Sequence, residues 1–343
     1  MNSLLKILLW GPSKLYQSVV WTRNLLFDKG LIKSTSFDAP FVLSVGNITV
    51  GGTGKTPHVE YLIRLLSERY RLAVLSRGYR RKTKGYLLAN EMNEVTAAEI
   101  GDEPYQIFSK FQNLQVAVDE NRVDGISRLR SLPEPPQIVL LDDAFQHRYL
   151  KPNFSVVLCD FNRPPFADSM LPMGQLREPL AGLKRADVVV VTKCPHHLSF
   201  QEFQFWRQKL QLQSSQPLFS SVVDYDHPQG LRGEMSLEAL KEKGNKVVLL
   251  TGIANPKPLY SYLSSHGVEY SHLKFADHHN FSSSDIQTIQ KACGGDSILL
   301  TTEKDFVRLK TILPAQLQER TFFLPIRVSL SEGFDQTILS QFP

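Results

Sequence analysis

Cysteine is scarce in this chain, which has three cysteines among its 343 residues. Cys159, Cys194 and Cys293 lie far apart, with neither a CxxC pair nor the spacing of a zinc site. The sequence therefore predicts no disulfide framework and no structural zinc, and it suits a reducing cytoplasm.

Long apolar runs are also missing. No uninterrupted stretch approaches the roughly 20 residues that a membrane-spanning helix needs. In residues 1–27 cations interrupt the apolar side chains, and the run 7–10 is too short for the core of a signal peptide. What remains is a basic amphipathic segment with Trp10 and Trp21, which we expect to be broken near Gly11-Pro12. It could lie in a membrane interface or pack on the protein's own core.

Charge is unevenly distributed along the chain. The net charge is +5. Apolar residues make up 42% of the sequence, which is ample for packed cores. Residues 1–33 and 64–84 hold strong local excesses of Lys and Arg. Such basic clusters suit nucleic acid, anionic lipid or a phosphorylated substrate.

Apolar runs alternate with helical stretches, a rhythm typical of a doubly wound, mainly parallel α/β sheet. The runs are residues 41–45, 72–75, 116–118, 138–141, 156–158, 188–191, 247–250, 298–300 and 322–325. Because the polar stretch 208–216 separates two sets of runs, we predict a P-loop-type domain over residues 28–220. A smaller α/β domain is expected over residues 221–343, and its last residues could return to the first domain.

The glycine-rich turn at residues 46–57 is the most informative motif of the chain. It follows an apolar run and precedes a helical pattern, and strand, glycine loop, Lys-Thr and helix form the layout of a phosphate-binding P-loop. We expect Lys55 to reach the terminal phosphates and the Thr56 hydroxyl to ligate Mg²⁺. The residues expected around the phosphates are Thr49, Val50, Gly51, Gly52, Thr53, Gly54, Lys55 and Thr56. The strict pattern has glycine where Thr49 stands.

Residues 192–195, Thr-Lys-Cys-Pro, indicate which nucleotide is bound. GTPases recognise guanine with an Asp at the last of these positions, where this chain has Pro195. The substitution favours ATP over GTP. Val50 stands where membrane-partitioning ATPases have a Lys before the glycine pair, which argues against that class.

Two carboxylates, Asp142 and Asp143, end the apolar run 138–141. In P-loop proteins an Asp at such a strand end holds Mg²⁺, directly or through water. We expect Asp142 to serve the metal and Asp143 to be a second carboxylate near it. Gln146 and His147 follow at the edge of the sheet where ligands bind in this architecture. The alternative is that acidic residues simply end a strand and begin a turn.

Three further motifs leave alternatives open. Asp102 could cap the helix that follows, with Pro104 in its first turn, or act as a base near the phosphates. The pair His278-His279 could bind a metal, although no other His/Cys cluster completes such a site, or approach the P-loop domain. Thr302 and Asp305 resemble a capping arrangement but could also contact a nucleotide.

Taken together and in this order, the motifs resemble those of tetraacyldisaccharide 4′-kinases, the lipid A 4′-kinases of Gram-negative bacteria. The likeness extends from the N-terminal segment to about residue 310, and the absent first Walker glycine is typical of that family. The motifs are GNxxVGGTGKTP at 46–57, SRGY at 76–79, GDEP at 101–104, DDxFQH at 142–147, LPxGxLREP at 171–179, VTK at 191–193, DHH at 277–279 and TEKD at 302–305.

The resemblance implies phosphoryl transfer from ATP, with Mg²⁺, to the 4′-hydroxyl of tetraacyldisaccharide 1-phosphate. It implies catalysis by Lys55, Asp142 and Asp102, the last assisted by His278 with His279 as fallback. It also implies an active site between the two domains, with the smaller one closing the cleft. The candidates for contact with the lipid substrate are Arg77, Tyr79, Gln146, His147 and Arg177.

The same resemblance implies a cellular location for the protein. Residues 1–27 become an interfacial anchor at the cytoplasmic face of the bacterial inner membrane, where the protein would be peripheral. The implied partners are the lipid substrate and an anionic membrane surface, with neither nucleic acid nor an obligate protein partner.

Parts of the sequence also fit two other functions. A kinase of small polar molecules would use the same P-loop, and phospholipid dependence of activity separates it from a lipid kinase. A nucleotide-binding scaffold without turnover would not need both Asp102 and Asp142, so their presence speaks against it.

Overall fold

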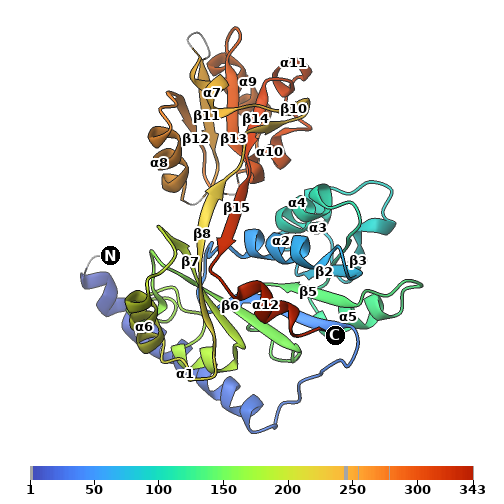
Figure 1. Ribbon diagram of the computed structural model, residues 1–343, viewed down its shortest axis with the longest axis vertical. Coiled ribbons are helices and arrows are strands. Elements are labelled where there is room, and N and C mark those ends of the chain that lie inside the picture. Colours follow the sequence, from blue (N-terminus) through green and yellow to red (C-terminus); the bar gives the residue numbers. More distant parts are fainter. Residues whose placement is uncertain (1–2, 243–245, 254, 278, 343) are drawn as a thin grey trace. The chain divides into compact units, whose positions relative to one another are not determined.

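The structure is a computed structural model that describes residues 3–242, 246–253, 255–277 and 279–342. The chain divides into two compact units, Met1–Val223 with Val328–Pro343, and Asp224–Arg327. Each unit is built on a mainly parallel sheet with helices, which confirms the predicted α/β fold class (Figure 1). The N-terminal segment belongs to the larger unit and does not form a separate body.

The larger unit contains a nine-stranded sheet in the order β15-β8-β7-β6-β1-β5-β2-β4-β3 among the described residues. The central strand β1 pairs in parallel with β5 and β6, whereas β3 runs antiparallel to β4. The strands are β1 (Phe41–Asn47), β2 (Leu72–Ser76), β3 (Leu87–Leu88), β4 (Gln115–Val118), β5 (Ile138–Asp142), β6 (Phe154–Asp160), β7 (Val188–Cys194), β8 (Leu218–Tyr225) and β15 (Ile326–Leu330). Every predicted strand of the P-loop domain is therefore present.

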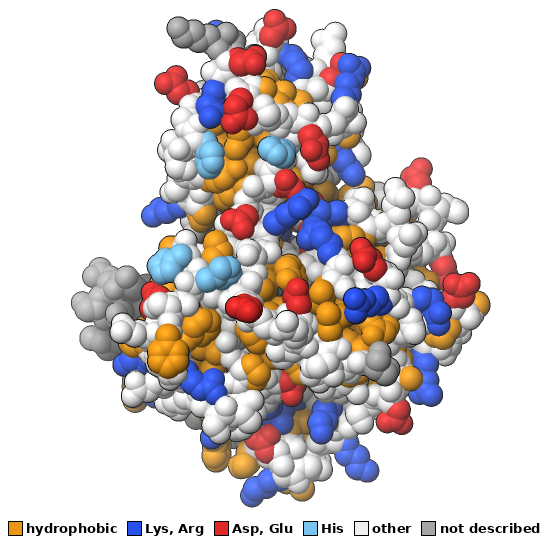
Figure 2. All heavy atoms as spheres, in the orientation of Figure 1, with side chains coloured by type: hydrophobic (Ala, Val, Ile, Leu, Met, Phe, Trp, Pro, Cys, Tyr) orange, Lys and Arg blue, Asp and Glu red, His pale blue; other side chains and the backbone are white. Residues whose placement is uncertain are grey.

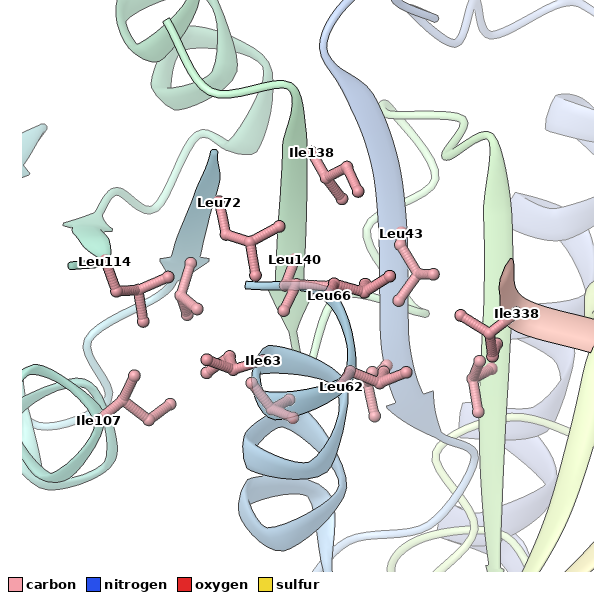
Figure 3. Close-up of a cluster of buried hydrophobic side chains, with 14 of the residues drawn as sticks. Leu43, Leu62, Ile63, Leu66, Leu72, Ile107, Leu114, Ile138, Leu140 and Ile338 are labelled. Carbon is pink, nitrogen blue, oxygen red and sulfur yellow. The ribbon is translucent and has the colours of Figure 1, made fainter. Parts of the chain in front are cut away.

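Helices cover this sheet and complete its core. Their bounds are α1 (Ser3–Asp28), α2 (Lys55–Leu66), α3 (Ala97–Ile100), α4 (Asp102–Lys110), α5 (Arg122–Arg130), α6 (Phe200–Lys209) and α12 (Phe334–Leu339). Leu62, Ile63 and Leu66 of α2 pack in one buried cluster with sheet residues and with Ile338 of α12 (Figure 3). Burial of each such side chain contributes about 1.5–3 kcal/mol, so α2 is firmly held on the sheet.

Helix α1 runs without interruption from Ser3 to Asp28, with Pro12 inside it, so the predicted break near Gly11-Pro12 is wrong. Proline removes one backbone hydrogen bond of a helix, but contacts that follow Pro12 keep this helix in place. Ser13 Oγ donates to the Met170 carbonyl at 2.8 Å, and Val20 is buried in a core cluster.

The solvent-exposed surface of α1 carries several large apolar side chains. Its exposed large side chains are Leu8, Trp10, Leu15, Val19 and Trp21. Across the described residues, no helix combines the length and the hydropathy that crossing a bilayer requires.

The smaller unit has a six-stranded sheet, ordered β10-β9-β14-β13-β11-β12 in its described part. Its strands are β9 (Gln229–Gly230), β10 (Gly233–Glu234), β11 (Val247–Thr251), β12 (Ser271–Lys274), β13 (Ile298–Thr302) and β14 (Thr321–Leu324). Its helices are α7 (Leu237–Lys241), α8 (Lys257–Ser265), α9 (Ser283–Ala292), α10 (Glu303–Leu309) and α11 (Ala315–Gln318). Strands β11 to β14 pair in parallel. The apolar runs of this region predicted β11, β13 and β14, but none of them covers β12.

The charged side chains are mixed on the molecular face that Figure 2 shows, where Lys and Arg alternate with Asp and Glu. Some cations of the basic segment 64–84 are also neutralised by partners. Arg81 is almost fully buried and pairs with Glu120 at 2.7 Å, so it does not join Arg77 and Arg80 as an exposed cation.

Candidate active site

The glycine loop connects β1 to α2 and adopts a conformation that requires glycine at two positions. Gly51 has φ 97° and Gly54 has φ 91°, both in the region that side chains disfavour. Gly54 is the N-cap of α2, and among the described residues no side chain caps this helix start. The first backbone N–H groups of α2 are thus available to an anion, as in a phosphate-binding loop.

Neighbouring strands hold the loop in place. Thr53 is buried, its hydroxyl accepts from the Asn47 amide at 2.7 Å, and its carbonyl accepts from the Thr192 hydroxyl at 2.9 Å. Lys193 donates to the Gly52 carbonyl and pairs with Asp160 at 2.6 Å. The segment 192–195, singled out for the missing guanine-recognition Asp, therefore supports the P-loop directly.

His58 is a second residue that supports the glycine loop, and the sequence patterns did not indicate it. Its Nδ1 lies 2.7 Å from the Gly54 carbonyl and its Nε2 lies 2.9 Å from Ser221 Oγ. Because a carbonyl only accepts, Nδ1 carries the proton and Nε2 accepts from Ser221. Burial lowers the pKa of His58 to about 4, so this histidine is neutral at pH 7. Its position one turn into α2 was the signal available in the sequence.

The carboxylates at the end of β5 face Lys55 and differ in their environment. Burial raises the pKa of Asp142 to about 6, against the attraction of Lys55. Burial also acts on Asp143, but Lys55 and Arg177 outweigh it and lower the pKa of this carboxyl. Asp143 Oδ2 lies 3.6 Å from Lys55 Nζ, and Oδ1 lies 2.7 Å from an Arg177 nitrogen. The structure thus brings Lys55, Asp142, Asp143 and Arg177 together.

Two of the residues proposed to contact substrate converge on Asn47, at the end of β1. Arg177 donates to the Asn47 side-chain oxygen as well as to Asp143. Gln146 donates to the Asn47 carbonyl at 2.6 Å. Both side chains therefore reach the start of the glycine loop, and both have protein partners there.

Asp102 is the first residue of α4, and Gly101 is the N-cap, so the capping role considered for Asp102 is wrong. Gly101 has φ 97°, and a Cβ at this position would lie 3.2 Å from the Gly78 backbone and from the Tyr79 carbonyl. The loop with Arg77 and Tyr79 therefore lies against the start of α4. Both side chains are exposed there.

Two observations place the start of α4 near the P-loop. The neighbour of Asp102, Glu103, is close enough to Asp142 to contribute to the raised pKa of that carboxyl. Further along α4, the Gln106 amide donates at 2.9 Å to Glu60, a buried residue of α2. The helix that begins with Asp102 is therefore attached to α2, the helix that begins with Lys55 and Thr56.

Arg122, the first residue of α5, is a further charged group that the sequence gave no reason to select. It is 3% exposed, and its guanidinium donates to the Asp119 carbonyl at 2.7 Å. Burial lowers its pKa to about 10, and the attraction of Asp142 acts in the opposite direction. A buried arginine thus adds positive potential beside the β5 carboxylates.

His147 is half-buried, and its Nε2 has no hydrogen-bond partner among the described residues. Burial, followed by the cations Arg122 and Arg77, lowers its pKa. An open pocket of about 470 Å³ lies beside it, lined by Lys33, Thr35, Glu120, Asn121, Val123, His147 and Tyr149. His147 is therefore polar, neutral at pH 7 and next to accessible space.

The loop after β12 carries the remaining candidates. Position 278 lies outside the described residues, so the structure gives no account of His278. His279 Nε2 donates to Asp285 at 3.0 Å, and Asp285 belongs to the capping box that begins α9. Hydrogen bonds from Ser282, followed by the one from His279, lower the pKa of Asp285 to about 2. His279 thus has a structural partner of its own.

The donor set beside the P-loop fits a magnesium ion bound together with phosphates. In the described part of the chain, no group of three or more His, Cys, Asp or Glu side chains forms a protein-only metal cage. Magnesium bound with nucleotide needs only one or two carboxylates, with phosphates and water supplying the rest. Asp142 Oδ1 is buried without a hydrogen-bond partner among the described residues, as a metal-ligand oxygen would be.

Comparison with known proteins gives one consistent family. The chain matches the family model "Tetraacyldisaccharide-1-P 4'-kinase" over residues 5–343. It is 46% identical over 340 residues to a tetraacyldisaccharide 4′-kinase of Flavobacterium johnsoniae, covering 98% of this chain and 97% of that protein. It is 42% identical over 353 residues to one of Bacteroides thetaiotaomicron, covering 96% and 92%.

A solved structure agrees with the sequence matches. LpxK from Aquifex aeolicus, described as an "apo" form in complex with ATP, has a TM-score of 0.79 and 31% identity to this chain. The match covers 99% of this chain and all of the other. The likeness therefore includes both units.

Proposed function

This chain belongs to the tetraacyldisaccharide-1-P 4′-kinase family, and from that premise we propose that it transfers a phosphoryl group from ATP to the 4′-hydroxyl of tetraacyldisaccharide 1-phosphate. One observation of the structure supports this activity above the others. Lys55 begins a helix whose start no described side chain caps, and it lies 3.6 Å from Asp143, the carboxylate that directly follows β5. This arrangement suits the binding and transfer of a phosphoryl group.

The chain's own residues have distinct roles in this proposal. Lys55 and backbone amides of the glycine loop stabilise negative charge on the phosphates, which is the main requirement of phosphoryl transfer. Asp102 accepts the proton of the sugar hydroxyl. A carboxylate is a weak base at neutral pH, so a histidine that orients it or shares the proton would help. His278 stays our prediction for this partner, and the closing of the smaller unit over the site stays a prediction with it.

Magnesium is the expected cofactor besides ATP. Thr56 and Asp142 would hold the ion, with Asp143 as a second carboxylate in its shell. When bound, the ion neutralises the phosphate oxygens and orients them. Arg177 and Lys55 keep Asp143 ionised, so this carboxylate is ready to accept hydrogen bonds from metal-bound water.

The lipid headgroup is proposed to bind near Arg77, Tyr79, Gln146, His147 and Arg177. Arg77 and Tyr79 are exposed beside the start of α4, and His147 borders an open pocket. Arg77→Gln should therefore raise KM for the lipid several-fold and leave KM for ATP nearly unchanged. A selective rise in KM for ATP would place Arg77 at the nucleotide instead.

The exposed apolar side of α1 is proposed to lie in the cytoplasmic face of the inner membrane. Its aromatic side chains suit the interface, and each nearby cation adds about 1 kcal/mol of attraction to anionic lipid. Because α1 also buries Val20 and Phe27, its deletion would disturb the core. Substitution of Trp10 and Trp21 by Gln is the cleaner test.

The membrane proposal is tested by sedimentation with anionic phospholipid vesicles. The double variant at Trp10 and Trp21 should shift from the pellet to the supernatant, while Phe200→Gln, which removes an exposed aromatic of α6, should not. Equal sedimentation of all three proteins would mean that the anchor lies elsewhere.

The activity itself is tested by incubating the purified protein with radiolabelled ATP, Mg²⁺ and tetraacyldisaccharide 1-phosphate in detergent micelles. We expect label in the lipid, at the 4′ position. Label in a water-soluble acceptor but none in the lipid would favour a kinase of small polar molecules.

A further inference from the structure

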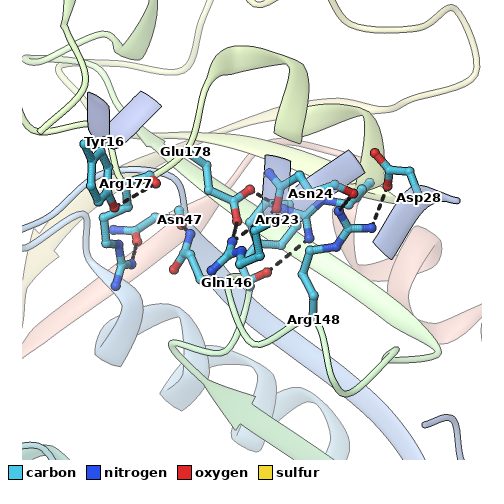
Figure 4. A network of polar contacts seen from close by, with 11 residues as sticks. Tyr16, Arg23, Asn24, Asp28, Asn47, Gln146, Arg148, Arg177 and Glu178 are labelled. Carbon is cyan, nitrogen blue, oxygen red and sulfur yellow. Dashed lines mark hydrogen bonds and ion pairs between the residues drawn. The ribbon is translucent and has the colours of Figure 1, made fainter. Parts of the chain in front are cut away.

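The inner side of α1 makes a set of polar contacts that a helix serving only as a membrane anchor would not need (Figure 4). Glu178 is fully buried, and its two carboxylate oxygens pair with Arg23 of α1, at 3.0 Å, and with Arg185. A buried carboxylate is stable only while such partners remain, so Arg23 is strongly linked to the segment around Glu178.

The residue before Glu178 connects the same segment to the active site. The Tyr16 hydroxyl of α1 donates to the Arg177 carbonyl at 3.2 Å, so the helix holds the backbone of Arg177. The guanidinium of Arg177 reaches away to Asp143 and to the side chain of Asn47. The main chain of Arg177 is thus held by α1, while its side chain contacts Asp143 at the end of β5.

The loop at residues 146–148 likewise connects α1 to the active site. Arg148 donates to the Asn24 carbonyl of α1 at 3.0 Å and pairs with Asp28, near the end of the helix, at 2.6 Å. In the same loop, Gln146 donates to the carbonyl of Asn47. Both loops held by α1 therefore converge on Asn47 (Figure 4), the residue whose amide supports Thr53 in the glycine loop.

We propose that α1 is a positioning element of the kinase active site, in which Tyr16 and Arg23 act through Arg177 and Glu178 to hold Arg177 on Asp143 and Asn47. The inference rests on the proposed function. Its physical basis is that misplacement of a charged group by about 1 Å can cost on the order of 100-fold in rate. A segment tied to a helix through buried polar contacts has little freedom to move.

The first test compares two variants that each remove one hydroxyl from α1. Tyr16→Phe loses the bond to the Arg177 carbonyl, whereas Ser18→Ala loses only an exposed bond within the helix. Turnover is measured in micelles of the lipid substrate and a non-ionic detergent, where recruitment to a vesicle is not required. We expect Tyr16→Phe to lower kcat about fivefold, as loss of one neutral hydrogen bond allows, with unchanged KM for ATP. Ser18→Ala should match the wild type.

A double-mutant cycle decides whether Tyr16 acts through Arg177. In an Arg177→Ala background the positioned guanidinium is gone, so Tyr16→Phe should have no further effect on kcat. Multiplicative effects of the two substitutions, or equal kcat for Tyr16→Phe and Ser18→Ala, would overturn the proposal.

Arg23 provides an independent variant. Arg23→Lys keeps a cation near Glu178 and should retain more kcat than Arg23→Gln, with melting temperatures recorded on the same samples. If kcat of Arg23→Gln equals that of the wild type while its melting temperature falls, the contact is structural only and the proposal is wrong. Failure of the proposed function is distinct, because the wild-type protein would then label no lipid at all.

Discussion

The N-termini of α2, in the larger unit, and α10, in the smaller unit, look alike in the sequence. They differ in whether their first backbone N–H groups remain available to a ligand. Both follow a buried strand, α2 after the glycine loop and α10 after β13. At α10 the N-cap Thr302 accepts from the Asp305 backbone N–H at 3.2 Å and donates to the Asp305 carboxylate at 2.7 Å. At α2 the N-cap is Gly54, which has no side chain to offer.

The difference shows what turns a helix start into an anion site. Asp305 is fully buried and also accepts from the Gly252 N–H at 2.8 Å, so the start of α10 is closed by the protein's own groups. The predicted capping arrangement of Thr302 and Asp305 is thereby confirmed. At α2 the same kind of backbone groups remain for a ligand, and Lys55 adds a full positive charge beside them.

The largest effect is expected at the carboxylates around the start of α2. Asp102→Asn removes the proposed base and should lower kcat by about 10²–10⁴-fold at any Mg²⁺ concentration. Asp142→Asn should also lower kcat, but raised Mg²⁺ should restore part of it, since this residue acts through the metal. Asp124→Asn, which changes an exposed carboxylate of α5, is the control. Equal rescue of both variants by Mg²⁺ would defeat this division of roles.

Removal of the cation at the same helix start should have the next largest effect. Lys55→Ala should lower kcat by roughly 10²–10³-fold, or about 3–4 kcal/mol, because a charge aimed at the transferring group is lost. Lys291→Ala, at the end of α9, serves as the matched control. Near-normal kcat in Lys55→Ala would mean that the glycine loop does not bind the reacting phosphates.

His58, which supports the start of α2, should make the free energy of unfolding depend on pH. The pKa of His58 is lowered to about 4 in the folded protein, from an ordinary value of 6.5. The unfolded chain therefore binds a proton more readily between these values. The contribution of His58 to the free energy of unfolding is therefore complete above pH 6.5. It falls by about 3 kcal/mol as the pH approaches 4.

Denaturant unfolding at a series of pH values measures this effect. His58→Gln should flatten the loss of stability between pH 6.5 and 4, whereas His266→Gln, at an exposed histidine, should leave it as in the wild type. The same slope in all three proteins would show that other groups cause it.

The closed start of α10 should give the smallest effect. Thr302→Ala removes a cap and should lower the free energy of unfolding by about 1 kcal/mol, with kcat changed less than about twofold. Chemical denaturation and a standard assay on the same preparation test both statements. A large fall in kcat without loss of stability would instead support a nucleotide contact at Thr302.

Local patterns predicted the elements more reliably than the interactions between them. The strands, the glycine loop and the Thr302 cap were predictable because each depends on a few adjacent residues. The break at Pro12 was predicted wrongly because contacts of α1 with a distant loop keep the helix continuous. The capping role of Asp102 was wrong because Gly101, pressed against Gly78, already occupies the cap position.

The sequence by itself determined the α/β class, the P-loop and, through the order of its motifs, the kinase family, which the comparisons confirm. Those features depend on local periodicity and on residues adjacent in the chain. Only the tertiary structure decided that His58 supports Gly54, that Arg122 is buried near Asp142, and that Glu178 joins α1 to the site. Each of these contacts joins residues brought together by the sheet and its loops, and neither burial nor a distant charged partner can be deduced from the spacing of residues along the chain.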